Sequence, residues 1–207
     1  MIELYTANTP NGKKISIMLE EIGYKYNVNT IDLNKGDQFN PEFKKISPFS
    51  KIPVIKDQDN NEVIFESGAI MLYLAIKYNK FISENDYWEI MKWFFFQISQ
   101  VGPFLGQAHQ YLYYNPGKSK YAEEKSKNYV KLVYETLDNR LSKSIYLGNK
   151  YSIADIATWP WIARYEMHKV DIKKYNNVLR WYKLISKKPK VIKGYNVSGI
   201  HQDIPQP

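Results

Sequence analysis

The chain begins with two different spacings of apolar positions. Ile2 and Leu4 stand between polar neighbours, and this period of two predicts a short strand. Apolar side chains then recur every three or four positions, which predicts a helix over residues 11–22 that ends at Gly23. The apolar stripe of this helix consists of Ile15, Met18, Leu19 and Ile22.

The elements that follow complete the order of a known fold. Strands are predicted over 26–33, 53–56 and 63–65, and helices over 41–46 and 67–79. Ser67 is expected to cap the last helix. The order β-α-β-α-β-β-α, with the first two strands parallel through a crossover helix, is that of the thioredoxin fold. We therefore expect a thioredoxin-like α/β domain over residues 1–80.

Residues 86–207 lack strand patterns and carry long helical ones. Helices are predicted over 86–115, 120–143, 154–169, 176–187 and 189–194. Gly102-Pro103 is expected to kink the first of them, because proline removes a donor and clashes with the preceding turn. Ser152 and Asp155 have the spacing of a capping box before an apolar run. The second domain is therefore expected to be all-α.

Composition narrows the classes of function. The 207 residues include no cysteine, which excludes zinc-thiolate sites, iron-sulfur clusters and any protein thiol nucleophile. The formal net charge of +8 lies in residues 81–207, but the lysines are mixed with acids and no arginine-rich run occurs, so no nucleic-acid partner is expected. No apolar window approaches about 18 residues and no signal-peptide pattern opens the chain, so we expect a cytoplasmic protein without a membrane partner.

Two loops of the α/β domain carry candidate binding groups. Pro53, after Lys51 and Ile52, stands where a thioredoxin-like domain places a cis proline, although most X-Pro bonds are trans. A cis bond would turn the backbone of Ile52 outward to accept an extended peptide. Glu66 and Ser67 lie at a strand-to-helix junction that suits an amino-acid head group bearing both charges. A plain serine cap beside a solvated glutamate is the alternative.

Polar residues ahead of the first helix form another candidate group. Thr9 and Asn11 flank Pro10 and could donate hydrogen bonds to an anion such as a thiolate. An ordinary N-cap and turn would also explain them. Gln38 and Lys51 are loop residues near the same edge of the sheet, where solvated surface is the alternative explanation.

Five segments occur in a characteristic order. They are YTANTPNG at 5–12, GDQF with PEF at 36–43, ISP with KIP at 46–53, FESGAI at 65–70 and YSIADIA at 151–157. Together they resemble the cytosolic glutathione S-transferases over residues 1 to about 195. More narrowly they resemble the Nu-class bacterial disulfide-bond oxidoreductases, which are similar to the transferase-like domain of a yeast nitrogen-catabolite regulator.

The resemblance implies a glutathione site on the thioredoxin-like domain of a homodimer. By position, Glu66 and Ser67 would hold the ammonium and carboxylate of the γ-glutamyl group. The backbone of Ile52, before Pro53, would pair with the cysteinyl backbone.

The resemblance also assigns the other end of the ligand and its sulfur. Lys51 and Gln38 would reach the glycyl carboxylate. Thr9 and Asn11 would face the sulfur as catalytic hydrogen-bond donors. Because the subgroup binds two glutathiones or glutathione disulfide, both reacting sulfurs would come from the ligand.

The same analogy places the helix after Gly102-Pro103 opposite the sulfur. Phe104, Gln107 and Tyr111 are therefore candidates for an acceptor pocket. No metal is expected, because the three histidines lack the spacing of metal ligands and are interpreted as incidental. They are His109, His168 and His201.

The expected activity is glutathione-dependent reduction of small or mixed disulfides. Two alternatives stay open. One is conjugation of glutathione to electrophiles, and the other is a glutathione-binding regulator without catalysis.

Overall fold

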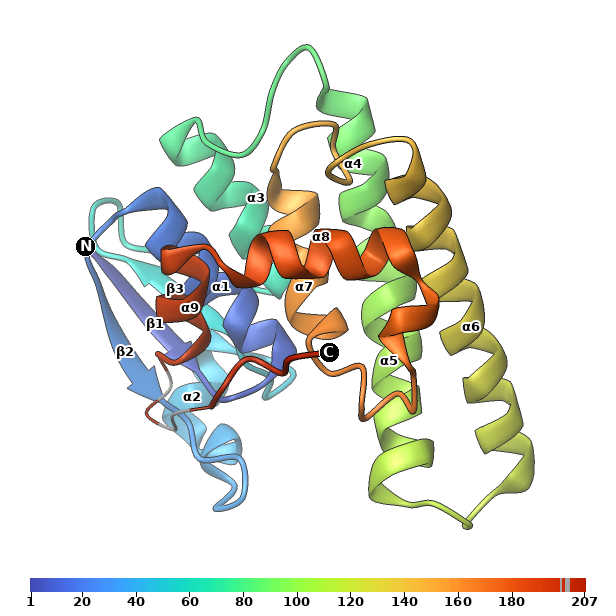
Figure 1. The fold of residues 1–207 in the computed structure, drawn as a ribbon. Helices are drawn as coiled ribbons and strands as arrows, with labels where there is room; N and C mark the ends of the chain where they lie inside the picture. The colour runs from blue at the N-terminus through green and yellow to red at the C-terminus, as the bar shows by residue number, and fades with distance from the viewer. Residues whose placement is uncertain (198, 200–201) are drawn as a thin grey trace. The chain divides into compact units, whose positions relative to one another are not determined.

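The computed structural model describes residues 1–197, 199 and 202–207 of the chain (Figure 1). The histidine at position 201 lies outside the described residues. The chain forms two compact units. The first consists of residues 1–80 with 188–204, and the second of 81–187 with 205–207. The helical pattern predicts that the segment after residue 187 belongs to the helical unit, whereas residues 188–204 group with the α/β unit.

The first unit has the predicted thioredoxin-like order. Its elements are β1 (Ile2–Thr6), α1 (Pro10–Ile22), β2 (Tyr26–Thr30), α2 (Pro41–Ile46), β3 (Val54–Asp57), β4 (Glu62–Phe65), α3 (Ser67–Tyr78) and α9 (Pro189–Tyr195), with a 3₁₀ turn at Asp37–Phe39. The sheet order is β2-β1-β3-β4. β1 pairs parallel with β2 and antiparallel with β3, and β3 and β4 form the predicted hairpin.

The ends of the first helix and second strand follow from local chemistry. α1 begins after Thr9, whose hydroxyl accepts the Gly12 N–H at 3.1 Å, and ends at Gly23 with φ 78°. β2 ends at Thr30 and not at residue 33, so the predicted boundary was wrong. The Asp32 side chain accepts the backbone N–H groups of Asn34 and Lys35. This turn competes with continuation of the strand.

α9 joins the first unit through close contact with α1 (Figure 1). The Ser16 hydroxyl donates to the Gly194 carbonyl at 2.6 Å. A Cβ added at Gly194 would lie 2.5 Å from the Ile17 Cα, so only glycine permits this approach. Lys193 forms an ion pair with Glu20 at 2.9 Å on the same surface. This packing of α9 on α1 explains why residues 188–204 group with the first unit.

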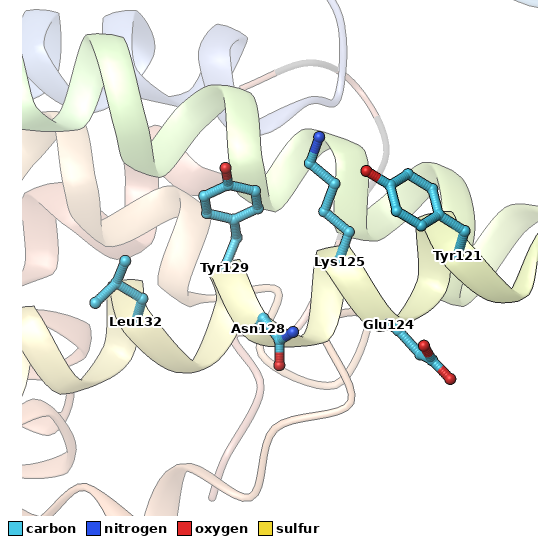
Figure 2. A pocket seen from close by; sticks show the side chains of 6 residues that line it. All are labelled: Tyr121, Glu124, Lys125, Asn128, Tyr129 and Leu132. Atoms are coloured by element: carbon cyan, nitrogen blue, oxygen red, sulfur yellow. The ribbon is translucent and has the colours of Figure 1, made fainter.

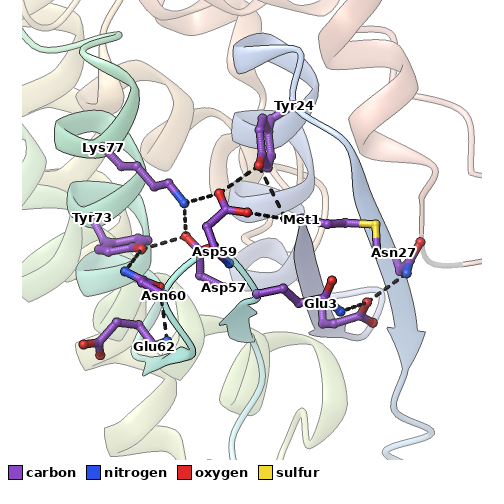
Figure 3. Close-up of polar contacts among 11 residues, drawn as sticks. Met1, Glu3, Tyr24, Asn27, Asp57, Asp59, Asn60, Glu62, Tyr73 and Lys77 are labelled. Carbon is purple, nitrogen blue, oxygen red and sulfur yellow. Dashed lines mark hydrogen bonds and ion pairs between the residues drawn. The ribbon is translucent and has the colours of Figure 1, made fainter.

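A buried carboxylate ties α3 to the hairpin turn (Figure 3). Asp57 is fully buried, accepts the Tyr73 hydroxyl at 2.7 Å and pairs with Lys77. Lys77 also reaches Asp59 at 2.7 Å. Because Tyr73 and Lys77 are one turn apart on α3, these bonds fix the helix against the β3–β4 turn and so set where its first residues lie.

The second unit is helical, as predicted. Its elements are α4 (Tyr87–Phe96), α5 (Gly102–Ala108), α6 (Lys120–Ser142), α7 (Ile153–Ile162) and α8 (Asn176–Ser186), with π-helical segments at Gln97–Val101 and His109–Tyr114 and a 3₁₀ turn at Ile172–Lys174. The run from Tyr87 to Tyr114 stays helical, and Pro103 stands in the first turn of α5, after a π-helical segment. Proline lacks a backbone N–H donor and its ring crowds the preceding turn of a helix. The wider π turn before Pro103 leaves more room for this ring.

The seventh helix is shorter than the sequence predicts. α7 ends at Ile162, whereas the pattern indicated residue 169. Pro160 stands inside the helix, and the bonds that follow span three residues, such as Arg164 N–H to the Trp161 carbonyl at 3.0 Å. These tight turns continue to Lys169, which has φ 59°. The predicted capping box is confirmed, since both reciprocal bonds of Ser152 and Asp155 are present.

In the described part of the chain, no helix combines the length and the apolar character that crossing a membrane requires.

Candidate functional site

A pocket of about 290 Å³ lies in the first unit. It is formed by the start of α1, the loop between α2 and β3, the end of β4 and the start of α3. Its lining residues are Asn11, Ser47, Phe49, Lys51, Ile52, Pro53, Phe65, Glu66 and Ser67. The pocket thus gathers six of the eight residues predicted for catalysis and glutathione binding, from segments up to 56 positions apart.

The loop before β3 is held in shape by one serine. The Ser47 hydroxyl donates to the Lys51 carbonyl at 2.7 Å and accepts the Lys51 N–H at 2.9 Å. Ser50 between them has φ 54°, a left-handed conformation that is uncommon for serine. The Ile52–Pro53 bond is cis, as the sequence context predicted. Ser47 is not among the residues predicted from the sequence, because its role depends on hydrogen bonds that no sequence pattern reveals.

The junction of β4 and α3 differs from the prediction in one detail. Glu66, and not Ser67, occupies the N-cap position of α3, with φ 68° and ψ 117°. Its side chain makes no capping bond, and Ser67 is the first helical residue. The prediction that Ser67 caps α3 was therefore wrong. The positive φ of Glu66 marks the start of the helix one residue earlier, so Ser67 is already helical. Left-handed backbone at a non-glycine residue is costly and often marks a functional site.

Ser67 contacts a lysine, Lys14, that is not among the residues predicted from the sequence. The Lys14 Nζ donates to the Ser67 Oγ at 3.2 Å, and the Lys14 side chain is 2 % exposed. Burial lowers the pKa of Lys14 to about 7, while the Glu66 carboxylate favours its charged form. A signal was present in the sequence: Lys14 precedes Met18 and Ile22 by four and eight positions, on the apolar face of the helix.

The two residues ahead of α1 have different places. Asn11 lines the pocket from the first turn of α1. Thr9 is the N-cap, with its hydroxyl oxygen engaged by the Gly12 N–H, and it is not among the lining residues. The capping interpretation of Thr9 therefore holds, and a contact of its hydroxyl with a ligand stays a prediction.

Gln38 and Lys51 also differ in placement. Lys51 lines the pocket, and its Nζ lies 5.7 Å from the centroid of the Phe49 ring. Gln38 belongs to the 3₁₀ turn 37–39 and does not line the pocket. Its Oε1 is buried and accepts no hydrogen bond within the described residues.

The proposed acceptor residues belong to the helical unit. Phe104 and Tyr111 are half-buried and Gln107 is exposed, and their spacing places them on one side of the α5 run. The Phe104 ring stacks on Tyr129 of α6 with centroids 3.8 Å apart.

Tyr129 in turn lines a shallow surface groove of about 430 Å³ along α6. Tyr121, Lys125 and Tyr129 point to the same side of this helix in Figure 2. Phe104 therefore has an aromatic partner that its sequence position does not reveal.

Two of the histidines, which were interpreted as incidental, form a buried hydrogen-bonded chain with Tyr134. The Nε2 atoms of His109 and His168 are 2.9 Å apart, and the His168 Nδ1 lies 2.9 Å from the Tyr134 hydroxyl. Burial lowers the pKa of His109 to about 4 and that of His168 well below its usual value. The described residues include no group of three or more His, Cys, Asp or Glu side chains that could hold a metal ion.

A thioredoxin-like domain with a pocket at its cis proline, joined to an all-helical unit, defines the class of glutathione-binding transferases. The sequence matches "Glutathione S-transferase, N-terminal domain" over residues 1–76 and "Glutathione S-transferase, C-terminal domain" over 101–189. The chain belongs to the glutathione S-transferase family.

Within this family, the chain is similar to several individual proteins. The disulfide-bond oxidoreductase YfcG of Escherichia coli (strain K12) is 42% identical, with 91% of this chain and 92% of the relative covered. A glutathione transferase from Pseudomonas putida, solved with one glutathione disulfide per subunit, superposes with a TM-score of 0.90 at 32% identity over 96% of this chain and 92% of that one. A glutathione transferase from Burkholderia graminis, solved with two glutathione molecules per subunit, superposes with a TM-score of 0.88 at 33% identity. The match covers 96% of this chain and 88% of that one.

Proposed function

We propose that this protein is a glutathione-dependent disulfide-bond oxidoreductase in which both reacting sulfurs belong to the ligand. One observation carries the proposal. A chain without any cysteine forms a pocket that combines a cis proline, a helix start and the Glu66–Ser67 pair. The relationship to YfcG, named a disulfide-bond oxidoreductase, supports the reaction.

The pocket suits glutathione from its γ-glutamyl end. Glu66 accepts the ammonium, and Ser67 with the first amides of α3 binds the carboxylate. The backbone of Ile52 pairs with the cysteinyl residue, as an added strand would. Lys51 and Gln38 are proposed to bind the glycyl carboxylate, although only Lys51 lines the pocket.

The reaction consists of two thiol–disulfide exchanges. A glutathione thiolate attacks one sulfur of the substrate disulfide, which gives a mixed disulfide and releases the first substrate thiolate. A second glutathione thiolate attacks the glutathionyl sulfur, so that glutathione disulfide forms and the second substrate thiolate leaves. Both leaving thiolates take up the protons that the two glutathione thiols gave up. The protein contributes proximity and a larger thiolate fraction.

Thr9 and Asn11 are the residues proposed to act on the sulfur. Neither titrates near neutral pH, so both act as hydrogen-bond donors to the thiolate and not as general bases. The positive end of α1 adds to this effect. Phe104, Gln107 and Tyr111 are proposed to contact the acceptor, a small disulfide.

The proposal is tested with one purified sample in two assays. We expect fast glutathione-dependent reduction of a model disulfide and slow conjugation to a model aryl halide. Dominant conjugation would replace the proposal with ordinary transferase activity. Tight glutathione binding with negligible turnover in both assays would favour a binding protein.

Replacing Ser67 with alanine is expected to weaken glutathione binding by roughly 1–3 kcal/mol, because an acceptor of the ligand loses its donor. Titration calorimetry measures the change. An unchanged affinity would remove Ser67 from the binding site. Ser142→Ala, at the exposed end of α6, serves as the control.

We also propose that the protein is a cytoplasmic homodimer. Trp88 and Phe95, seven positions apart on α4, are 75% and 54% exposed, which is a large apolar surface for a single copy. The cytoplasm supplies the reduced glutathione that the reaction consumes. Light scattering after gel filtration is expected to give twice the chain mass of 24.4 kDa, and a mass equal to one chain would contradict the dimer.

A further inference from the structure

Two adjacent lysines are buried on α1, and their surroundings differ. Lys13 and Lys14 are each 2 % exposed, although lysine is among the residues least often buried. The Nζ of Lys13 lies 3.1 Å from the centroid of the Tyr195 ring and donates to the Gln202 Oε1 at 3.2 Å. Lys13 is thus directed toward the C-terminal segment, whereas Lys14 is directed toward the first residue of α3.

The buried position of Lys14 makes nearby negative charge favourable for its charged form. Its Nζ lies 3.2 Å from the Oγ of Ser67, at the end of α3 where the helix dipole is positive. A buried ammonium at this place is repelled by the helix end and loses its hydration. The Glu66 carboxylate offsets part of this cost. An anion bound at Ser67 would offset more.

We propose that Lys14 is a positioning residue for the head-group carboxylate of the ligand. The inference rests on the proposed function, which places that carboxylate at Ser67. Lys14 donates to a lone pair of the Ser67 oxygen, so the hydroxyl hydrogen of Ser67 is directed away from Lys14 and toward the ligand. The ammonium also supplies a fixed positive charge behind the hydroxyl, which strengthens the bond to a carboxylate.

The proposal makes binding dependent on pH. In the free protein, burial lowers the pKa of Lys14 to about 7. A bound carboxylate favours the charged amine and raises this pKa, so the complex takes up a fraction of a proton near pH 7.5. Affinity therefore falls as pH rises above 7.

Several charged groups near α1 have partners of their own within the described residues. Glu66 acts on Lys14 from the α3 side. On α9, Lys193 pairs with Glu20, and Lys190 donates to a carbonyl of α1. Lys13 on α1 itself faces the Tyr195 ring.

The first experiment is titration calorimetry with S-methylglutathione, which has no titrating thiol. For the wild type we expect affinity to fall roughly 10- to 30-fold between pH 6.5 and 8.5. At pH 7.5 the binding enthalpy should depend on the ionisation enthalpy of the buffer, which reports proton uptake. Lys14→Met should bind about 10- to 100-fold more weakly at pH 6.5 and keep only the small pH dependence that the ligand amine contributes.

Two further variants separate charge from packing. Lys14→Gln keeps a donor to Ser67 without charge, and it should also lose the proton uptake. Lys13→Met removes the neighbouring buried lysine and should keep the affinity and pH profile of the wild type. The ligand amine begins to deprotonate in this range, and Lys14→Met measures that contribution.

The second experiment uses two analogues that each lack one head-group charge. The 4-aminobutyryl analogue lacks the α-carboxylate, and the glutaryl analogue lacks the amine. Lys14→Met should change the affinity for the first by less than about threefold and should still weaken the second about 10-fold or more. Equal losses for both analogues would overturn the link between Lys14 and the carboxylate.

The outcomes distinguish this inference from the proposed function. If the wild type does not bind S-methylglutathione, the proposed site itself is wrong. If the wild type binds and Lys14→Met keeps the same affinity and pH profile, only the positioning role of Lys14 is wrong. Thermal unfolding of each variant confirms that the comparison is made on folded protein.

Discussion

Replacing Asp155 with asparagine is expected to destabilise the helical unit by roughly 2–4 kcal/mol, because at least one N–H donor of a fully buried network loses its acceptor and the remaining donors lose a charged one. One carboxylate oxygen accepts the Leu147 N–H and the Trp181 Nε1–H, both at 2.8 Å. The other accepts the N–H and the hydroxyl of Ser152, both at 3.1 Å.

The amide cannot replace the carboxylate in either orientation. Asparagine offers one oxygen and one NH₂ group. With the NH₂ group toward Leu147 and Trp181, two N–H donors would face a donor; with it toward Ser152, the hydroxyl can turn to accept but the Ser152 N–H would still face a donor. Burial already raises the pKa of Asp155 to about 6, which shows how weakly this site is solvated. Because Leu147 and Ser152 lie in the loop before α7 and Trp181 lies on α8, their bonds to Asp155 hold the start of α7 against α8 and that loop.

The midpoint of urea unfolding, followed by circular dichroism, measures this effect. Asp171→Asn is the matched control, since Asp171 caps an exposed 3₁₀ turn with a single bond of 3.1 Å to the Lys173 N–H. It should cost about 1 kcal/mol or less. Similar midpoints for the two variants would show that the Asp155 network contributes little.

The capping box illustrates how far the sequence could predict the structure. Ser152 and Asp155 are three positions apart, so the local pattern was enough to predict their reciprocal bonds. Trp181 is 26 positions away and joins Asp155 only through folding. The length of α7 was overestimated for a similar reason, because apolar periodicity continues through the tight turns after Ile162.

The residues of the candidate site also differ in whether local sequence patterns could predict them. Asn11, Glu66 and Ser67 were identified because turn and helix-start chemistry is local, and Pro53 was identified because the order of elements gave its context. Lys14 was overlooked because one charged residue on an apolar stripe looks like an exception until its partner at Ser67 is known.

The aromatic residues of the rim were overlooked for another reason. Phe49 and Phe65 are 79% and 46% exposed, and both line the pocket. Apolar residues in a sequence predict burial, so no local pattern distinguishes a phenylalanine at a pocket rim from one in a core.

Replacing Asn11 with alanine is expected to lower kcat for disulfide reduction about 100-fold, the usual cost of removing one donor from a developing anion in an enclosed site. The proposal places the Asn11 amide beside the glutathione sulfur. Its hydrogen bond is stronger to a thiolate than to a thiol, so the variant should lose turnover and keep most of its affinity for glutathione.

Three measurements decide the role of Asn11. In the wild type the pKa of bound glutathione, read from thiolate absorbance, should lie below that in Asn11→Ala. Asn11→Asp should be slower still, because a carboxylate of similar size repels the thiolate. Asn40→Ala removes a helix cap outside the pocket and should keep wild-type kcat. If Asn11→Ala raises the Michaelis constant alone, Asn11 binds glutathione without stabilising its thiolate.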